Sequence, residues 1–336
     1  MTRVSSSLTR RCFHALSASM LVLPTLAWAQ GGAAAWPSKA VTVIVPFSPG
    51  GGTDAIARLV GLKLAASLKQ PFIIDNRVGA SGMIGTTAVA KAPPDGYTIT
   101  VGLSTSLLIN QFLYAKMPYD AQKDLAMVYR LAAGTQILAV KPSLPVKNGT
   151  ELLAYIKANK GKLSYGSYGA GSTPHLFGAY LNHITNGEMN HVPYKGEAPM
   201  NQDFLGGQID MAWVSAAAAK QHILAGKMKP IGVNATERMK ALPDVPTLKE
   251  SGITDPVFQM EGWLAVAVPA KVPKEIQDKL AAEIRKAMQD PEVQRKIEEM
   301  GFRPVLNSNP ETFTAEYKQQ LPKWAELVKI SGAKLD

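Results

Sequence analysis

The most informative segment of the sequence runs from Val41 to Arg58, VTVIVPFSPGGGTDAIAR, where a buried-strand pattern leads through a glycine triplet into a helix start. The glycines at 50–52 carry no Cβ, so the backbone can take positive φ and a ligand can approach it closely. Thr53 or Asp54 can cap the helix, whose first N–H groups and positive dipole end then face the loop. A phosphate loop would place a lysine after the glycines, whereas Asp54 follows Thr53 here. The stretch therefore favours a carboxylate site, with a plain strand-to-helix turn as the alternative.

Short apolar runs alternate with helical patterns after Trp36, which predicts an α/β fold with strands flanked by helices. A first block of strands is expected at 41–45, 72–74 and 97–103, and a second at 137–141, 163–166, 209–214 and 229–233. An apolar run returns at 258–268, and helical patterns fill 151–158, 174–184, 273–301 and 310–330. Ligand sites in such folds lie at the carboxyl ends of the strands.

The order of the two blocks predicts two lobes joined by a hinge. The chain leaves the first block near residue 134 and returns near residue 259. Lobe 1 is therefore expected from residues 36–134 and 260–336, and lobe 2 from residues 135–259. Two crossings of this kind let two lobes close over a ligand.

The first 29 residues predict an export signal, because Arg3, Arg10 and Arg11 precede an apolar run that ends in a small-residue site at Ala29. The protein is therefore expected in the periplasm without a membrane anchor, by either the twin-arginine or the general secretory route. The only cysteine, Cys12, lies inside this signal, so no disulfide is expected in the mature chain. The net charge of +10 comes from 36 basic and 26 acidic residues without a long basic run, which disfavours a nucleic-acid partner. We expect a monomer that binds a small anion.

Three further strand-to-helix turns carry donors suited to an anion. The segment 75–85, DNRVGASGMIG, offers backbone N–H groups and the Ser81 hydroxyl, while Arg77 either contacts the anion or pairs with Asp75. Hydroxyls at Ser104 and Thr105 follow the third strand and can donate to a ligand, cap a helix, or both. In lobe 2, glycines 169 and 171 form a turn before a helix that Ser172 or Thr173 caps, with Pro174 in its first turn. This turn predicts a second anion site facing the first.

His175 lies in that first helical turn, where the helix dipole favours its neutral form. The spacing of His175, His183 and His191 resembles a metal site, but eight helical residues span roughly 12 Å, too far for shared ligands. We therefore expect no metal and no cofactor. Tyr194 follows Val192 and Pro193 in a loop, and Asp210 and Trp213 are expected to end a strand that lines the cleft, although Trp213 equally suits the core.

Signatures of catalysis are missing from the sequence. No GxSxG elbow, HExxH, GxGxxG or lysine-bearing phosphate loop occurs. We therefore expect that the protein is not an enzyme. Two alternatives stay open: an exported hydrolase that uses Ser172 and His175, and a ligand-sensing subunit for a membrane receptor.

Five collinear blocks together resemble the extracytoplasmic solute-binding receptors of tripartite tricarboxylate transporters. The blocks are VPFSPGGGTD at 45–54, DNRVGASGMIG at 75–85 with PDGYT at 94–98, YGSYGAGSTPHL at 165–176, VPYKG at 192–196 with GGQID at 206–210, and GWLAVAVPAKVP at 262–273. They extend over nearly the whole chain after the expected signal. The resemblance implies a two-lobed periplasmic-binding-protein fold of type II, in which each lobe has a mixed, mostly parallel sheet flanked by helices.

The resemblance further implies capture of a carboxylate-bearing solute between the lobes and its delivery to a membrane permease. Two facing anion sites favour a ligand with two acidic ends, and dicarboxylates and aromatic acids are among the candidates. The candidate ligand-binding residues are Phe47, Ser48, Gly51, Gly52, Thr53, Asp54, Gly79, Ala80, Ser81, Gly82, Ser104, Thr105, Ser172, Thr173, His175, Tyr194 and Asp210.

Overall fold

The apolar run from Val41 to Val45 forms strand β1 of a six-stranded sheet within residues 36–335, the part of the chain that this computed structural model describes. The expected export signal lies outside the described residues. The sheet has the strand order β11-β4-β10-β3-β1-β2. Its other strands are β2 (Phe72–Asn76), β3 (Thr98–Leu103), β4 (Leu125–Gly134), β10 (Gly262–Pro269) and β11 (Arg303–Pro304).

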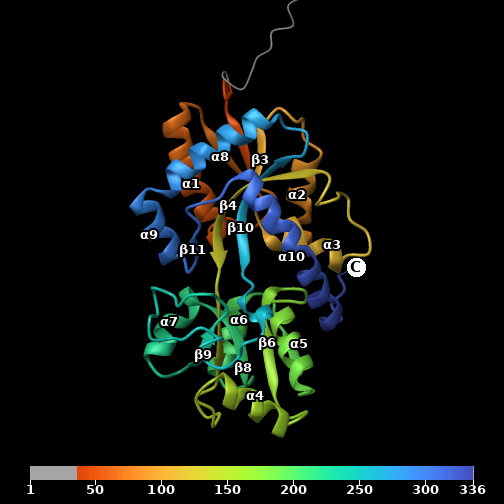
Figure 1. Ribbon diagram of the computed structural model, residues 1–336, viewed down its shortest axis with the longest axis vertical. Helices are drawn as coiled ribbons and strands as arrows, with labels where there is room; N and C mark the ends of the chain where they lie inside the picture. The colour runs from red at the N-terminus through yellow and green to blue at the C-terminus, as the bar shows by residue number, and fades with distance from the viewer. Residues whose placement is uncertain (1–35, 336) are drawn as a thin grey trace, which may run out of the picture. The chain divides into compact units, whose positions relative to one another are not determined.

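Helices cover both faces of this first sheet (Figure 1). The chain forms α1 (Gly52–Leu68), a 3-10 turn η2 (Ala80–Gly82) leading into α2 (Met83–Ala90), and a π-helical turn η3 (Thr105–Ile109) leading into α3 (Asn110–Leu113). The segment 273–301, expected as one helical stretch, is two helices, α8 (Lys274–Met288) and α9 (Pro291–Glu299). It breaks there because Asp290 caps α9 and Pro291 occupies its first turn. The long helix α10 (Pro310–Ser331) begins after Asn309, whose side chain caps it, and continues through Pro322.

A second sheet, with the order β7-β6-β8-β5-β9, forms the other lobe. Its strands are β5 (Gln136–Val140), β6 (Ser164–Ser167), β7 (Asn190–Pro193), β8 (Met211–Ser215) and β9 (Lys229–Val233). Its helices are α4 (Gly149–Ala158), α5 (Thr173–Thr185), α6 (Glu197–Leu205) and α7 (Ala216–Leu224), followed by the short 3-10 helix η4 (Pro256–Gln259).

Both sheets are mixed, as expected, but parallel pairs are not the majority. β1 pairs in parallel with β2 and β3, and β6 with β7 and β8. β10 instead runs antiparallel to both β3 and β4, and β5 runs antiparallel to both β8 and β9. The reason lies in the crossings between lobes: β4 leaves the first sheet where β10 enters it, so these neighbours must point in opposite directions.

The strand directions place the carboxyl ends of the parallel strands of both sheets at the junction of the lobes. β3 ends at Leu103 opposite Leu264, close to where β10 begins, and β8 ends at Ser215 opposite Gln136, where β5 begins. The parallel partners of β3 and β8 end on the same side. The carboxyl ends of both sets of parallel strands therefore face the junction, where ligand sites of α/β folds form.

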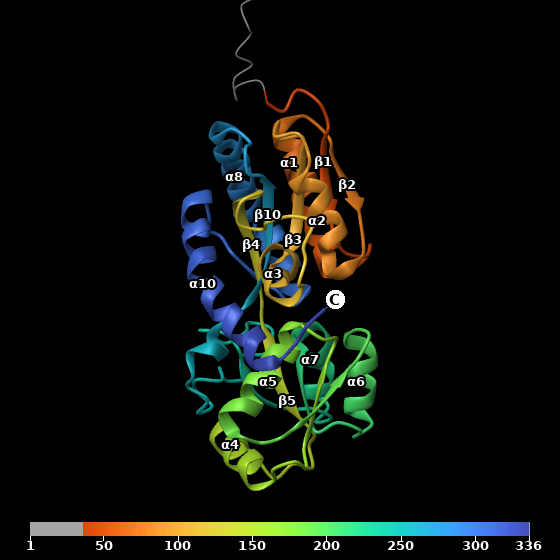
Figure 2. The same cartoon turned by 90° about the vertical axis from the view of Figure 1, so that its right-hand side faces the viewer.

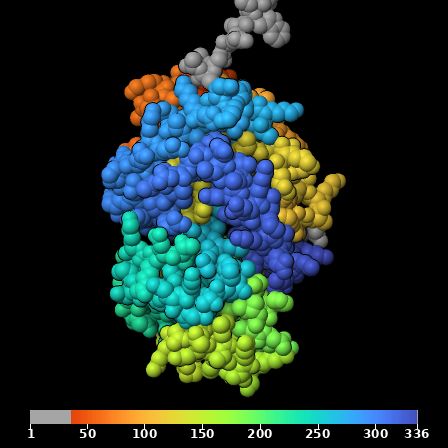
Figure 3. All heavy atoms as spheres, viewed as in Figure 1, coloured from red at the N-terminus to blue at the C-terminus, as the bar shows by residue number. Residues whose placement is uncertain are grey.

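Helix α10 also joins the two lobes, beside the strand crossings. It runs along the first lobe and reaches α5, and it lies across the junction in the space-filling view (Figures 2 and 3). The ring of Trp324 on α10 lies 6.1 Å from that of Phe177 on α5. The end of α10, which the sequence assigned to lobe 1, thus also packs on lobe 2. Within residues 36–335 no helix has the length and apolar character needed to span a membrane.

Candidate functional site

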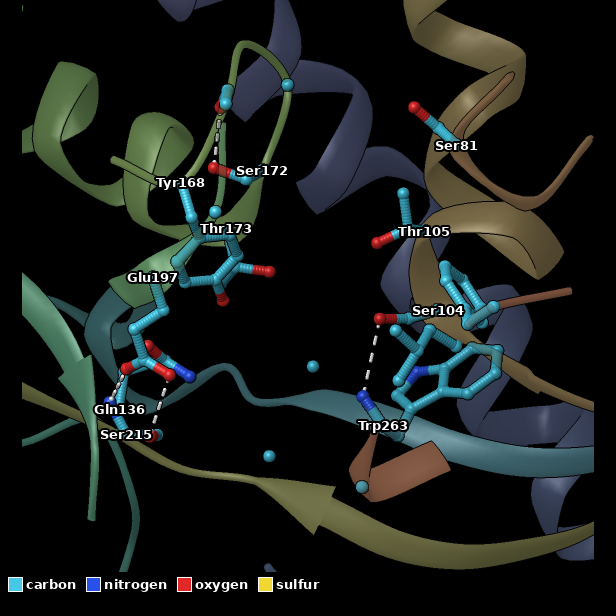
Figure 4. A pocket seen from close by; sticks show the side chains of 18 of the residues that line it. Ser81, Ser104, Thr105, Gln136, Tyr168, Ser172, Thr173, Glu197, Ser215 and Trp263 are labelled. Carbon is cyan, nitrogen blue, oxygen red and sulfur yellow. Dashed lines mark hydrogen bonds between the residues drawn. The ribbon is translucent and has the colours of Figure 1, made fainter. Parts of the chain in front are cut away.

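A cavity of about 660 Å³ lies at the junction and takes its walls from both lobes (Figure 4). Its volume falls within the range of roughly 300–1,000 Å³ that is usual for small-molecule sites. Seven of the residues proposed from sequence line it: Phe47, Gly52, Ser81, Ser104, Thr105, Ser172 and Thr173.

The first wall is built around the start of α1. Gly51 is the N-cap residue and no side chain caps the helix, so the first N–H groups of α1 are open toward the loop. Gly52 is required by close packing, because a Cβ there would lie 2.7 Å from Cε2 of Phe302, another lining residue. The glycine triplet therefore leaves backbone N–H donors of α1 beside the cavity, where the sequence predicts an anion site.

Hydroxyl groups extend this wall. Ser81 sits in η2 at φ 53°, with its carbonyl held by the Asn110 side chain at 3.1 Å. Ser104 Oγ accepts the backbone N–H of Trp263 at 3.3 Å, which leaves its own hydrogen available to donate. Thr105 begins η3 beside it, and Figure 4 shows Ser81, Thr105 and Ser104 along one side of the cavity. This wall offers N–H and O–H donors without a cation.

The opposite wall comes from the loop that joins β6 to α5. Glycines 169 and 171 take φ values of 137° and 74°, and Ser172 is the N-cap of α5 without a side-chain cap bond. Ser172 Oγ donates instead to the carbonyl of Gly169 at 2.6 Å. The open start of α5 at Thr173 thus faces the cavity from lobe 2.

Comparison with known proteins identifies the family of this fold and cavity. Residues 56–332 match the model of the tripartite tricarboxylate transporter family receptor, TctC. The chain belongs to the TctC family. A relative from Pseudomonas sp., a UPF0065 protein encoded between tcbD and tcbE, is 36% identical over 88% of this chain and 87% of its own length.

Solved structures of similar proteins agree with this assignment. An R. palustris protein determined with adipate has a TM-score of 0.75 and 33% identity, covering 89% of this chain and all of that one. MatC from Rhodopseudomonas palustris, determined with bound malate, has a TM-score of 0.71 and 30% identity, covering 87% of this chain and all of that one. The protein is thus a TctC-family solute-binding protein with the expected α/β fold.

Asp54 of this TctC-family chain does not face the cavity, contrary to expectation. Its carboxylate accepts the backbone N–H of Gly50 at 2.9 Å, the Asn76 amide at 3.0 Å and Nε of Arg58 at 2.9 Å. The hydrogen bond from Arg58 is the main reason that the pKa of Asp54 falls to about 2. Asp54 therefore shapes the glycine loop. Six other predicted residues belong to the turns before α1 and α2 or to the helix starts there, but they do not line the cavity: Ser48, Gly51, Thr53, Gly79, Ala80 and Gly82.

His175 also lies behind the cavity rather than in it. Its Nδ1 accepts the backbone N–H of Gly171 at 3.0 Å, and burial lowers its pKa, so the neutral form supports the loop. Its ring stacks on His191 at 4.0 Å, and His191 Nε2 lies 2.7 Å from Ser167 Oγ. The spacing argument that separated these histidines is wrong, because His191 is on β7 rather than on α5. The residues 36–335 contain no cluster of three or more His, Cys, Asp or Glu able to hold a metal.

The Ser172 and His175 pair expected of a hydrolase is not assembled as a nucleophile and base. Ser172 Oγ donates to Gly169, and His175 Nδ1 accepts from Gly171. Each side chain is thus bonded to the loop backbone. The TctC family and its structural neighbours are solute-binding proteins.

Tyr194 and Asp210 are the two remaining residues that the structure places elsewhere. The Tyr194 hydroxyl donates to Asp203 at 2.8 Å. Asp210 precedes β8, where it pairs with Lys141 and accepts the N–H of Ser164 at 2.7 Å. Asp210 was misplaced because β8 continues to Ser215, so the strand presents its other end to the cavity. Trp213 lies within β8 and stacks on Phe258 in the core.

Sequence reasoning missed several lining residues. Glu197 follows Gly196, whose φ is 120°, so the same pattern of a glycine turn before a helix could have found it. Gln136 begins β5 beside the first crossing, and Tyr168 starts the lobe 2 loop. Met300, Phe302 and Leu335 reach the cavity only through the packing of the C-terminal segments, for which the sequence carries no local signal.

Proposed function

We propose that this TctC-family protein is a periplasmic receptor that captures a carboxylate-bearing small molecule between its lobes and passes it to the permease of a tripartite transporter. The observation that carries the proposal is the wall formed by the open start of α1 and the hydroxyls of Ser81, Ser104 and Thr105. These groups converge on a cavity large enough for a small metabolite.

Neutral donors suit a carboxylate in this position. Each charge-assisted hydrogen bond to an ionised group contributes about 1.5–3 kcal/mol, so several of them offset desolvation without a buried lysine. No lysine or arginine is among the described residues that line the cavity. The adipate and malate found with two structural neighbours support the same ligand class here.

Closure of the lobes follows from the two walls. A solute that contacts both walls stabilises the closed arrangement over an open one, because only the closed arrangement provides all of its contacts. The permease can then distinguish the loaded receptor from the empty one by the relative placement of its lobes.

The proposal is tested by calorimetric titration of the purified protein with carboxylic acids and with their neutral amides. Carboxylates should bind and matched amides should not. Thr105→Val, which replaces the hydroxyl by a methyl of similar shape, should weaken carboxylate binding by about tenfold, which is the loss of about 1.4 kcal/mol. Ser143→Ala, at an exposed hydroxyl in lobe 2, is the control and should leave affinity unchanged.

Delivery is measured as uptake of the bound solute by membrane vesicles that hold the permease subunits. Uptake should depend on added receptor and should fall with Thr105→Val in proportion to occupancy. Equal binding of acid and amide would contradict the carboxylate assignment, and receptor-independent uptake would contradict the transport role.

A further inference from the structure

We propose that Glu197 and Gln136 make the lobe 2 end of the cavity selective for a hydrogen-bond donor, so that the solute carries a carboxylate at one end and an ammonium or hydroxyl group at the other. This inference rests on the proposed function, because it takes the carboxylate to bind at the wall of α1. It differs from the expectation of a ligand with two acidic ends.

Glu197 already occupies the anion site that the start of α7 would offer. Its Oε1 accepts the backbone N–H of Ser215 at 2.6 Å, and its Oε2 accepts the Ser215 hydroxyl at 3.0 Å. Ser215 is the N-cap of α7 and accepts the N–H of Ala218 at 3.3 Å. A ligand carboxylate that approached the Ser215 N–H would compete with Glu197 for it and would meet the charge of Glu197. The protein has therefore filled this position with a negative charge of its own.

Each carboxylate oxygen of Glu197 can accept more than one hydrogen bond. Only one bond to each oxygen comes from Ser215. Figure 4 shows Glu197, Gln136 and Ser215 together on the side of the cavity away from Ser104 and Trp263. Glu197 thus retains acceptor capacity at the end of the cavity that faces away from the α1 wall.

Gln136 provides independent evidence for a hydrogen-bond donor on the ligand. The residue is only 9% exposed and lines the cavity, yet its Oε1 has no hydrogen-bond partner within the described chain. Its backbone N–H is bound separately by Asn234. A buried acceptor without a partner is unfavourable, so such groups normally meet a donor. A donor on the ligand would satisfy Glu197, and it would satisfy Gln136 after a rotation of the amide that turns the buried Oε1 toward the cavity.

The charge of the cavity points to the same class of ligand. Glu197 is the only charged side chain among the described residues that line it. A second carboxylate at this end would lie near Glu197, and the two like charges would repel each other. An ammonium group would be attracted instead, and a hydroxyl group would donate without repulsion.

Tyr168 on the same wall presents a further polar group. Burial and the negative charge of Glu197 raise the pKa of the Tyr168 hydroxyl, which keeps it protonated. It can both donate and accept a hydrogen bond. Tyr168 can therefore form a hydrogen bond with an ammonium or hydroxyl group, and it supplies no positive charge that would attract a second carboxylate.

The test compares ligands that differ only at the far end. Glutarate, 4-aminobutyrate, 4-hydroxybutyrate and butyrate form one set, and terephthalate, 4-(aminomethyl)benzoate and benzoate form an aromatic set. Calorimetric titration of the wild-type protein should show the amino or hydroxy acid of at least one set binding at least about tenfold more tightly than its dicarboxylate, a difference of about 1.4 kcal/mol.

Two variants assign the selectivity to residues. Glu197→Gln keeps an acceptor for Ser215 but removes the charge, so it should reduce the preference by about tenfold, mainly through tighter dicarboxylate binding. Gln136→Leu should weaken the donor-ended ligand and leave butyrate or benzoate unchanged. Glu188→Gln removes the same charge from the surface of lobe 2, where Glu188 pairs with Lys160, and should change nothing.

The outcomes separate this inference from the proposed function. Tighter dicarboxylate binding by the wild type, or an unaltered preference in both variants, overturns the inference and leaves carboxylate capture intact. Failure of every ligand in both sets to bind overturns both. Thermal unfolding of each variant is measured alongside. Should Glu197→Gln unfold, Gln136→Leu decides, because within residues 36–335 no group donates a hydrogen bond to Gln136 Oε1 that the substitution could break.

Discussion

At the scale of single residues, the histidines behind the cavity show how a buried ring can hold a binding loop. His175 and His191 stack at 4.0 Å, and the first accepts the N–H of Gly171. Burial lowers the pKa of both, and the neighbouring His175 contributes to bringing that of His191 to about 4. Both rings are therefore neutral in the folded protein at neutral pH, and only a neutral Nδ1 can accept from Gly171.

This pair makes stability depend on pH in a defined window. The unfolded chain takes up protons on these histidines near their ordinary pKa of about 6.5, whereas the folded chain resists protonation until His191 titrates near pH 4. Folding stability should therefore fall as pH drops from 6.5 to 4, by at most about 1.4 kcal/mol per pH unit for each proton. Urea unfolding at several pH values measures the slope.

Substitution of His175 tests separately its hydrogen bond with Gly171 and its contribution to the pH dependence of stability. His175→Phe leaves the Gly171 N–H without its acceptor, so stability at pH 7 should fall by about 1–3 kcal/mol. The slope between pH 6.5 and 4 should become shallower, because one titrating group is gone. His183→Phe on the exposed side of the same helix is the control. A slope unchanged by His175→Phe would contradict the assignment.

At the scale of elements, the turns around the cavity depend on glycines at specific places. Gly82 joins η2 to α2 with a φ of 85°, and a Cβ there would lie 2.9 Å from Cβ of Ser106 and 3.0 Å from Cζ of Phe47. Phe47 lines the cavity and Ser106 lies in η3, next to Thr105. The turn and the α1 wall are therefore packed directly on each other.

Gly82→Ala should consequently damage both stability and binding. An alanine in the left-handed region costs roughly 1–2 kcal/mol, and the contact with Phe47 adds to this. Gly161→Ala is a matched control, since Gly161 has a φ of 75° but open space around the added Cβ. Both variants should lose stability in urea unfolding, and only Gly82→Ala should weaken carboxylate binding. Equal affinity in the two variants would show that the contact with Phe47 is unimportant.

The elements also show what the sequence could and could not predict. The apolar runs of β1, β3 and β9 and the helical patterns of α4 and α10 are local signals, and the structure has these elements where they were expected. β4 was missed because its sequence, LAMVYRLAAG, is buried along most of its length and lacks the alternation of a half-exposed strand. The edge strand β7 was missed for the opposite reason, since none of its four residues is buried.

The parts of the cavity also differ in whether the sequence could predict them. The glycine turns of both lobes could be predicted because strand, turn and helix are adjacent in sequence. The turn before Glu197 carries the same signal, but the meeting of Glu197 with Gln136 and Ser215 could not be predicted, because the three come from separate segments and Gln136 reaches Ser215 only when β5 pairs with β8. Asp54 and His175 were misassigned because a polar residue at a helix start can serve the loop as readily as a ligand.

At the scale of the whole molecule, the contacts that join the lobes within residues 36–335 include two strand crossings, helix α10 and an ion pair between Lys240 and Glu298 at 2.8 Å. The two strand crossings are tied to each other: Glu261 accepts the Thr135 hydroxyl at 2.9 Å, and the Asn234 side chain accepts the N–H of Gln136 while donating to the carbonyl of Met260 at 2.8 Å. Helix α10 joins the lobes through its buried Trp324, which packs on Phe177 of lobe 2. Movement of the lobes must therefore either slide α10 over α5 or carry the end of α10 with lobe 2.

Replacement of Trp324 tests whether α10 restrains the lobes. Trp324→Leu removes the ring that contacts Phe177 but keeps an apolar side chain, so it should cost less than the roughly 3–5 kcal/mol of a truncation to alanine. The freed lobes should separate more widely in the absence of ligand, which small-angle X-ray scattering detects as a larger radius of gyration. Ligand affinity should fall as well, because closing the lobes from a more open arrangement costs more free energy. A destabilised variant with an unaltered radius of gyration would instead mean that α10 does not set the separation of the lobes, and that the contact between Trp324 and Phe177 only adds to the core.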